Sequence, residues 1–341
     1  MSADRTILLV GDIVDDPDSA SERPIHDEDN PSKSEVENLV EWIGEAGYTV
    51  DVCGDVRSFI ESGHQNKNII VFPLWRGGFS RNRTAIIPAY CEECNIPFVG
   101  GDAYVQTVCQ DKSLSKLLSN AVNINTTREL VIRSYSELKY FEPLVHMRPP
   151  FVVKPLLSAC SIGINDASLC HNNEQARQHA EHLFFLGLGP VLCEEFIQGD
   201  EISLCIIEER GTIIQRCVGG YRDEFGQCPF RDRLFTFDDK INMFPTWTIH
   251  SLSENLVQNT WKKAEKLIHI LGKVGIIRID GRIKDGVFYL IELTPDIHMS
   301  LESIFLGSFN SIGYHPSYLL NKIIQSSVIN FQNNGFSSSK C

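Results

Sequence analysis

Two carboxylates, Asp280 and Glu292, stand on opposite sides of a tight turn in the segment RIDGRIKDGVFYLIELTPD (278–296). Both lie within apolar runs that are typical of strands, and a charged group in apolar surroundings is costly unless it is paired or bound to a cation. The turn signal at residues 284–286 predicts a β-hairpin that brings the two runs together. Two carboxylates that converge in this way are suited to bind Mg²⁺, which prefers oxygen ligands.

The register of this hairpin decides which side chains share a face. We place Ile283 opposite Val287, so that Arg278 faces Glu292 on the partner strand. Asp280 is then a diagonal neighbour of Glu292, with Cβ atoms roughly 7–8 Å apart or somewhat less. That separation allows one Mg²⁺ to bind both carboxylates. A salt bridge between Arg278 and Glu292 fits the same geometry, and the hairpin by itself does not distinguish the two interpretations.

Two lysines have the surroundings of phosphate ligands. Lys154 ends the apolar run PFVVK and precedes the small-residue segment PLLSACSIG (155–163), whose backbone N–H groups can point at an anion. Lys112 opens a helical stretch, where a lysine seen alone is by default a solvated one. The spacing differs from G-x-x-x-x-G-K-[ST], so a Walker-type phosphate loop is excluded.

The segment VLCEEFIQGDEISL combines a strand with polar residues at its end. The strand reaches Glu194 and is followed by Glu195, Phe196 and Ile197, and Glu201 comes after a Gly-Asp turn. Backbone groups beside an apolar side chain can recognise an adenine edge, and a carboxylate such as Glu201 can accept hydrogen bonds from ribose hydroxyls. A surface hairpin with solvated acids is the alternative.

The first part of the chain predicts a parallel sheet that is covered by helices. Up to about residue 108, short apolar strands such as TILLVGD (6–12) alternate with helical stretches, which is the pattern of such a sheet. The stretch 34–48 has apolar residues at helical spacing, with Ser34 as its expected cap and Gly47 as its stop.

From residue 112 the pattern changes. A strand, a loop and a strand at 149–164, a helix near 173–187 and two strands around a Gly-Asp turn at 190–209 favour a compact α+β unit. The remainder mixes strands, a charged loop and helices. It contains the hairpin and a final helix near 315–327.

Composition excludes some classes of function. The chain has 341 residues and a net charge of −13, which argues against nucleic acid or an anionic membrane surface as its main partner. No apolar stretch approaches the roughly 20 residues that a bilayer span needs. Eleven cysteines, an odd number scattered along the chain, fit the reducing cytoplasm better than a secreted disulfide framework.

Taken in order, five motifs resemble those of the ATP-grasp superfamily, and most closely those of D-alanine–D-alanine ligases. They are VGGDAYVQTVCQDKSLSKLL, PFVVKPLLSACSIGI, VLCEEFIQGDEISL, IRIDGRI and FYLIELTPDIHMSLES, within roughly residues 70–325. The resemblance implies an α/β fold with an N-terminal parallel-sheet domain (1–111), a central α+β lid (112–194) and a C-terminal α+β domain with the metal site (195–332). A disordered tail (333–341) would follow, and ATP would bind between the lid and the C-terminal domain.

The resemblance also implies a role for each candidate residue. The residues implied to contact ATP are Lys112, Lys154, Ser161, Glu194, Glu195, Phe196, Ile197 and Glu201. The ligands implied for Mg²⁺ or Mn²⁺ are Asp280, Glu292 and Thr294. At the reacting centre, Arg278 would stabilise the tetrahedral intermediate, Lys240 would lie in a mobile closing loop, and Ser303 would hold the carboxylate of the second substrate.

The activity implied is ATP- and Mg²⁺-dependent formation of an amide or peptide bond between an amino-acid-type carboxylate and an amine, through an acyl phosphate. Its partners are therefore small molecules, and the family also allows a homodimer. Some positions depart from the family pattern: Thr294 replaces an Asn of the metal strand, and Ala159 and Cys160 replace a Gly and a Ser of the phosphate loop. His298 would crowd the acceptor pocket or present a polar ring to a different substrate. The alternative function is a non-catalytic ATP-binding protein that serves regulation or interaction.

The first domain departs further from that pattern. Arg76, Arg81 and Arg83 stand where the family carries a histidine motif, and they would either favour a more acidic or larger carboxylate or be solvated loop cations. The acid that would bind the first substrate's ammonium group has only two candidates, Glu28 and Asp29. Two versions of the ligase are therefore open, a D-alanine–D-alanine ligase proper and a ligase for a specialised dipeptide or an amino-acid conjugate, and these departures favour the second.

Overall fold

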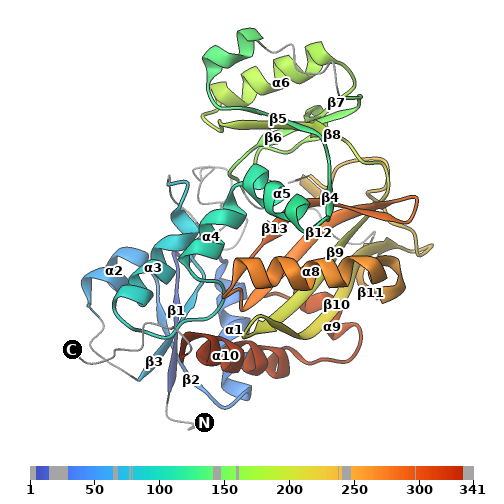
Figure 1. Cartoon of the computed structure of the whole chain (residues 1–341). Helices are drawn as coiled ribbons and strands as arrows, with labels where there is room; N and C mark the ends of the chain where they lie inside the picture. The colour runs from blue at the N-terminus through green and yellow to red at the C-terminus, as the bar shows by residue number, and fades with distance from the viewer. Residues whose placement is uncertain are drawn as a thin grey trace.

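In the computed structural model, the residues that are described form three β-sheets and the helices that cover them (Figure 1). It describes residues 5–14, 30–63, 68–76, 78, 80–140, 147–158, 161–236, 238–239, 247–295 and 297–332. Some residues considered above lie outside these described ranges: Glu28, Asp29, Ala159, Cys160, Lys240 and the tail 333–341.

The N-terminal sheet is parallel, as the alternation of strands and helices predicts. In the order β2-β1-β3, it contains β1 (Thr6–Val10), β2 (Thr49–Cys53) and β3 (Ile69–Pro73). The helices around it are α1 (Lys33–Glu45), α2 (Val56–Glu61) and α3 (Ile86–Glu93). Side chains alternate across each strand, so one face packs on α1 and the other on α2 and α3. Ser32 caps α1 in place of the expected Ser34, because its hydroxyl accepts the N–H of Glu35 at 3.2 Å.

The largest sheet has six strands and carries the hairpin. In sheet order they are β11 (Trp247–Leu252), β10 (Thr212–Asp223), β9 (Asp200–Glu209), β12 (Ile276–Lys284), β13 (Val287–Thr294) and β4 (Asn125–Thr126). The helices packed around it are α4 (Ala103–Gln110), α5 (Lys112–Ala121), α8 (Gln258–Leu271), α9 (Ile304–Asn310) and α10 (Pro316–Gln332). One face packs on α4 and α8, while α9 and α10 join the other face to the N-terminal sheet in a shared apolar core.

The lid sheet stands apart from the other two, at the top of Figure 1. In the order β5-β8-β6-β7, it contains β5 (Glu129–Ile132), β6 (Phe151–Pro155), β7 (Leu169–Cys170) and β8 (Val191–Glu195), and α6 (Asn173–Phe185) covers it. The strand expected near 161–164 does not form, because Ser161 and Gly163 have φ angles of 60° and 75°, which an extended strand does not allow. The two strands expected around the Gly-Asp turn belong to different sheets, β8 to the lid and β9 to the six-stranded sheet.

The hairpin forms, but the predicted register is wrong. Lys284 pairs with Val287, so the turn has two residues rather than three, and both have positive φ, as tight hairpin turns require. A β-bulge after Asp280 then shifts the pairing. As a result Asp280 lies directly opposite Glu292 instead of diagonal to it, and Arg278 does not face Glu292.

The segment that contains α4, α5 and β4 packs with the six-stranded sheet. Strand β4 pairs with β13, and α4 contributes to the core beneath β9 and β12. The domain boundaries given above stay a prediction. Short 3₁₀ helices occur at Arg83–Ala85, Tyr135–Tyr140, Asp166–Ser168 and Glu254–Val257. Among the described residues, none of the helices has both the length and the apolar character that crossing a membrane requires.

Candidate active site

A cavity of about 390 Å³ lies between the lid sheet and the six-stranded sheet. It is lined by residues of α5, β6, β8, β9, β12 and β13 and of the loops between them. Thirteen predicted site residues line it: Lys112, Lys154, Ser161, Glu194, Glu195, Phe196, Ile197, Glu201, Arg278, Asp280, Glu292, Thr294 and Ser303. Lys240 is outside the described residues. The fold therefore brings together side chains from distant parts of the chain, while their individual roles stay predictions.

Asp280 is the most heavily bonded acid at the metal end of the cavity. It forms a bidentate ion pair with Arg278, with Nε–Oδ1 and Nη2–Oδ2 distances of 2.8 Å. It also accepts hydrogen bonds from the hydroxyls of Ser203 (2.5 Å) and Thr294 (3.1 Å). Burial would lower the pKa of Arg278, but the Asp280 carboxylate outweighs it and raises that pKa. Arg278 is thus a fixed cation at this end of the cavity.

Glu292 is more open than Asp280. Its side chain is 30% exposed, and its Oε2 lies 3.6 Å from Nζ of Lys112. With Asp280 and Thr294 it forms a set of hard oxygen donors, the kind that Mg²⁺ takes. The described residues contain no cluster of three or more His, Cys, Asp or Glu that could hold a metal ion, but Mg²⁺ is usually held by one or two carboxylates together with substrate phosphates and water. These three residues therefore fit Mg²⁺ that binds with a phosphate.

A second charged cluster, centred on Glu194, lies on the lid side. Its Oε1 is 2.5 Å from Nζ of Lys154, while its Oε2 contacts Nζ of Lys116 and accepts the hydroxyl of Thr127 at 2.7 Å. Burial raises the pKa of Glu194, but the two lysines outweigh it and lower that pKa to about 2. For Lys154, burial would lower the pKa, but the Glu194 carboxylate outweighs burial and raises it. An adenine contact of Glu194 would therefore compete with two buried lysines.

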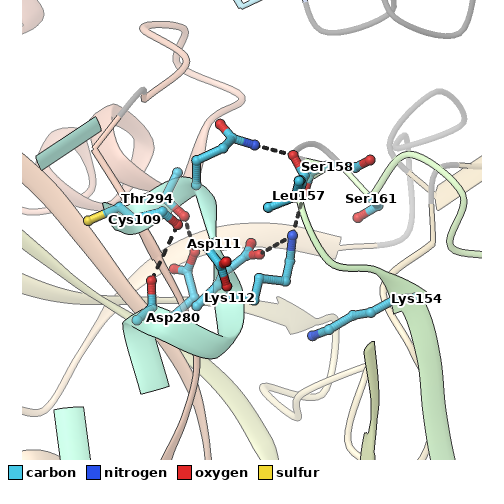
Figure 2. A network of polar contacts seen from close by, with 12 residues as sticks. Cys109, Asp111, Lys112, Lys154, Leu157, Ser158, Ser161, Asp280 and Thr294 are labelled. Atoms are coloured by element: carbon cyan, nitrogen blue, oxygen red, sulfur yellow. Dashed lines mark hydrogen bonds and ion pairs between the residues drawn. The ribbon is translucent and has the colours of Figure 1, made fainter. Parts of the chain in front are cut away.

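Lys112 reaches from the first turn of α5 to the loop that follows β6 (Figure 2). Its Nζ donates to the carbonyl of Ser158. The neighbouring carbonyl of Leu157 accepts the amide of Gln110 and, at 3.1 Å, the guanidinium of Arg83. Burial lowers the pKa of Lys112, although a nearby carboxylate acts in the opposite direction. Lys112, Gln110 and Arg83 thus hold this loop at the edge of the cavity, and Lys112 is itself implied to bind phosphate.

The segment after β8 is already hydrogen bonded. The N–H groups of Glu195 and Phe196 donate to the carbonyls of Arg128 (3.2 Å) and Pro150 (2.9 Å). These two N–H groups therefore hold the segment in the lid, and adenine recognition through them would need those bonds to break.

Glu201, the residue implied to hold the ribose, is paired with Arg282 at 2.8 Å. Arg282 is buried, and its guanidinium lies 4.6 Å from the centre of the Phe196 ring. It also donates to the carbonyls of Ile197 (3.1 Å) and Arg233 (2.7 Å). Arg282 therefore ties β12 to the segment after β8 and to a loop that follows β10, and it fixes the wall of the cavity at its nucleotide end.

Tyr221, Glu302 and Ser303 also line the cavity. The Ser303 hydroxyl donates to the carbonyl of Ser300 at 2.8 Å, just before α9. The Ser161 hydroxyl donates to the carbonyl of Phe235 at 3.2 Å. This last bond joins the lid loop to a loop that belongs to the six-stranded sheet, so the lid lies over the cavity.

A third cluster, which we call the interface triad, consists of Glu35, Arg76 and His298. Nδ1 of His298 lies 3.2 Å from Oε2 of Glu35 and 3.3 Å from Nη1 of Arg76. Nη2 of Arg76 is 3.8 Å from Oε1 of Glu35. Glu35 and Arg76 are buried, whereas His298 lines the cavity. Burial raises the pKa of Glu35, but His298, Arg76 and a hydrogen bond from the Met299 N–H outweigh it, and that pKa falls to about 2.

The arginines of the first domain do not act as free cations of the cavity. Arg76 is committed to the interface triad, and Arg83 donates to the carbonyls of Arg76 (2.8 Å) and Leu157 (3.1 Å). Arg81 is exposed. Neither Arg76 nor Arg83 is among the residues that line the cavity, so their predicted role in selecting an acidic carboxylate has no support here.

Sequence reasoning missed three charged residues of this region. Lys116 follows Lys112 by four positions on one helix, a spacing that puts both on the same face. Arg278, Asp280 and Arg282 alternate along one strand, so the sequence could also have predicted that Arg282 shares their face. Glu35 had no such signal, because only the tertiary structure brings α1 beside the turn after β13.

The family model "D-ala D-ala ligase C-terminus" matches residues 128–325 of this chain. A D-alanine–D-alanine ligase of Clostridium botulinum is 24% identical over 257 residues, which are 75% of this chain and 80% of that protein. A D-alanine–D-alanine ligase of Coprothermobacter proteolyticus is 24% identical over 296 residues, which are 86% of this chain and 93% of that protein.

Solved structures of similar proteins show the same fold. D-alanine–D-alanine ligase from Bacillus anthracis in complex with ATP superposes with a TM-score of 0.68 at 19% identity, over 96% of this chain and 98% of that chain. VanG D-Ala:D-Ser ligase from Enterococcus faecalis superposes with a TM-score of 0.67 at 16% identity, over 95% and 99%. Because the family model covers more than half of the chain, this protein belongs to the D-alanine–D-alanine ligase family of ATP-grasp ligases.

Proposed function

We propose that this chain uses ATP and Mg²⁺ to join the carboxylate of one amino-acid-type substrate to the amine of another. The observation that carries the proposal is that one cavity is lined by two lysines, three residues with oxygen donors suited to Mg²⁺ and an arginine held by an ion pair. A carboxylate is anionic and a poor electrophile, so it needs activation before an amine can attack it. Phosphorylation supplies a good leaving group, and the charges that line this cavity suit phosphoryl transfer.

In the first step, a carboxylate oxygen attacks the γ-phosphorus of ATP, and the bond from that phosphorus to the bridging oxygen breaks and releases ADP. Lys112 and Lys154, which both line the cavity, would neutralise phosphate charge as it moves. Mg²⁺ held by Asp280, Glu292 and Thr294 would add positive charge at the phosphate oxygens. The product is an acyl phosphate.

In the second step, the amine attacks the acyl carbon and phosphate departs. Arg278 suits the role of oxyanion stabiliser, because its ion pair with Asp280 holds it in place before the reaction begins. The contact between Ser161 and Phe235 keeps the lid over the cavity, which protects an acyl phosphate from water.

We also propose that the two substrates are not both D-alanine. The support is that His298 and Glu302, which both line the cavity, present a polar ring and a carboxylate to it. The nine cysteines among the described residues are all free, and we propose that the protein works in the cytoplasm, where thiols stay reduced. The net charge of −13 supports small molecules rather than nucleic acid or membrane as partners, and a homodimer remains part of the proposal.

Nucleotide turnover tests this function. The protein is incubated with Mg-ATP and pools of D- or L-amino acids, and ADP, AMP and phosphate are separated by chromatography. We expect ADP and phosphate to appear only with a particular pool, which then leads to the two substrates. Release of AMP would contradict the acyl-phosphate route. Binding of ATP with no turnover in any pool would favour the non-catalytic alternative.

A further inference from the structure

We propose that Arg282 is a positioning residue for the nucleotide. It holds the Glu201 carboxylate in the orientation that receives a ribose hydroxyl, and it thereby sets how strongly the cavity prefers a ribonucleotide. This inference rests on the proposed function, because it takes ATP as the ligand and Glu201 as its ribose contact. Residue 282 has no role among those that the sequence resemblance implies.

Arg282 is a buried cation that is paired with an acid of the cavity wall. The residue is 2% exposed, and its Nη2 lies 2.8 Å from Oε2 of Glu201. A buried charge is costly unless it is paired and hydrogen bonded. Glu201 supplies the opposite charge, so this ion pair is a fixed part of the wall.

Three backbone carbonyls complete the surroundings of the guanidinium. Nη1 of Arg282 donates to the carbonyls of Ile197 (3.1 Å) and Arg231 (3.4 Å). Nη2 donates to the carbonyl of Arg233 at 2.7 Å. The guanidinium also lies over the Phe196 ring, 4.6 Å from its centre, which is a favourable place for a cation. Because a guanidinium presents its donors in a rigid, planar fork, these contacts together fix the orientation of the side chain.

The two segments that Arg282 joins are also bonded to each other. The N–H of Gly199, after β8, donates to the carbonyl of Arg231, in the loop after β10, at 3.0 Å. The Arg231 side chain pairs with Asp200 at 2.8 Å but is 63% exposed, and exposed ion pairs contribute little to stability. Arg282 is therefore the buried link between these segments.

Glu201 keeps one oxygen for a ligand. Its side chain lines the cavity and is 25% exposed. Oε2 is bound to Arg282, whereas Oε1 has no hydrogen bond with any residue that the structure describes. A ribose hydroxyl can therefore donate to Oε1 without breaking the ion pair. Because the two oxygens of a carboxylate are rigidly joined, an anchored Oε2 also fixes the direction of Oε1.

This arrangement lowers the cost of ribose binding. A glutamate without a partner has to give up its rotamer freedom when a ligand binds, and that loss weakens the affinity. Arg282 imposes the orientation of Glu201 before the nucleotide arrives. Loss of Arg282 should therefore weaken the contact between Glu201 and the ribose, even though Arg282 itself does not touch the sugar.

Arg282 also has a purely structural interpretation. It would hold the wall of the cavity together even if Glu201 never met a ribose. Loss of Arg282 would then weaken the binding of every adenine nucleotide by the same factor. The positioning role predicts a loss that is confined to nucleotides with the ribose hydroxyl, so the two interpretations differ in a ratio of affinities.

The test compares ATP with 2′-deoxy-ATP and 3′-deoxy-ATP. Dissociation constants are measured by calorimetry with Mg²⁺ and without amino acids, so that binding is measured rather than ligation. We expect the wild type to bind ATP roughly 10–100-fold more tightly than at least one of the two analogues, because a hydroxyl that donates to a carboxylate is lost. In R282K this ratio should fall below about threefold, since an ammonium lacks the planar fork that holds Glu201.

A second variant and a matched control complete the series. R282Q removes the charge and should also lower the ratio. In R216K an arginine is replaced that pairs with Glu254 at 2.9 Å and lies 4.5 Å from the centre of the Trp261 ring, but does not line the cavity. R216K should keep the wild-type ratio. Partial unfolding does not obscure the result, because a smaller binding-competent fraction weakens the apparent binding of all three nucleotides by the same factor.

The outcomes are distinct. A wild-type ratio in R282K and R282Q would overturn the positioning role, whether or not all three nucleotides bind more weakly. Loss of folding in both variants would show a structural link and overturn it as well. Equal binding of the three nucleotides by the wild type would overturn it and leave the proposed function in place. Absence of ATP binding by the wild type would refute the proposed function, and the role of Arg282 with it.

Discussion

The cavity contains two carboxylate clusters that differ in how their charges are paired. The Glu194 side chain is 4% exposed, and both of its oxygens are bonded to buried lysines. The Glu292 side chain is 30% exposed and has one lysine at 3.6 Å. A buried acid with every oxygen paired is costly to disturb, because removal of one partner leaves an uncompensated charge. An open acid can exchange its lysine for a metal ion at lower cost. We infer that the pair of Glu194 and Lys116 holds the geometry, whereas the more open Glu292 and its Lys112 take part in the chemistry.

The largest expected effect comes from Asp280→Asn, which removes a charge from the metal end. We expect turnover to fall by roughly 10²–10⁴-fold, because metal-ion stabilisation is worth several kcal/mol. The measurement is ADP release with saturating Mg-ATP.

Ser203→Ala is the matched control for this change, because it removes one hydrogen bond to Asp280 (2.5 Å) without changing the charge. It should cost about 1 kcal/mol of stability and retain most of the turnover. Equal losses in the two variants would mean that Asp280 acts through local structure rather than through its charge.

A pair of lysines one helical turn apart sharpens the comparison. Lys116 belongs to the buried cluster of Glu194, whereas Lys112 faces Glu292 and lines the cavity. Lys116→Met should lower the free energy of unfolding by about 3–5 kcal/mol. Lys112→Met should change it far less and should instead abolish most of the turnover. Urea denaturation measures the free energy of unfolding, and ADP release measures turnover. If one of the two variants showed the larger loss in both assays, the division into a structural and a chemical cluster would be contradicted.

Acid should destabilise the protein through the buried acids. The pKa values of Glu194 and Glu35 are lowered from 4.5 to about 2 in the folded protein. Each carboxylate therefore stabilises the fold at a pH above the pKa that it has in the unfolded chain. This stabilisation is lost as the pH falls through the pKa that it has in the folded protein. We expect the free energy of unfolding to fall by several kcal/mol between about pH 5 and pH 2. Lys116→Met should weaken this dependence, because it removes one cation that lowers the pKa of Glu194. A pH-independent urea midpoint would refute the pairing.

The smallest effect concerns the third oxygen donor. Thr294 offers a hydroxyl where the family pattern that the sequence resembles has an Asn, and it donates to Asp280 at 3.1 Å. Thr294→Asn should strengthen Mg²⁺ binding, so that the Mg²⁺ concentration needed for half-maximal turnover falls by less than about tenfold. This corresponds to under about 1.4 kcal/mol. The measurement is the Mg²⁺ concentration at half-maximal ADP release. If the variant needs a higher Mg²⁺ concentration for half-maximal ADP release, residue 294 is not a ligand.

Local patterns predicted much of the fold. The strand Thr6–Val10, the helix at 173–185 and the hairpin all follow from apolar periodicity and turn signals in their own segments. The hairpin register was missed for two reasons. Asp285-Gly286 forms a two-residue turn, for which it is a strong local signal, instead of part of a three-residue one, and a bulge after Asp280, which has no such signal, shifts the pairing. The strand expected near 161–164 does not form, because Ser161 and Gly163 have positive φ angles.

The sequence by itself determined the residue types that meet in the cavity and the order of motifs that assigns the family. Only the tertiary structure decided how their charges are paired. Ion pairs depend on distances below about 4 Å between side chains, and the partners here come from separate elements, as in Glu194 with Lys116 and Glu35 with His298. Burial then decides which of these pairs is rigid and which can open to a ligand.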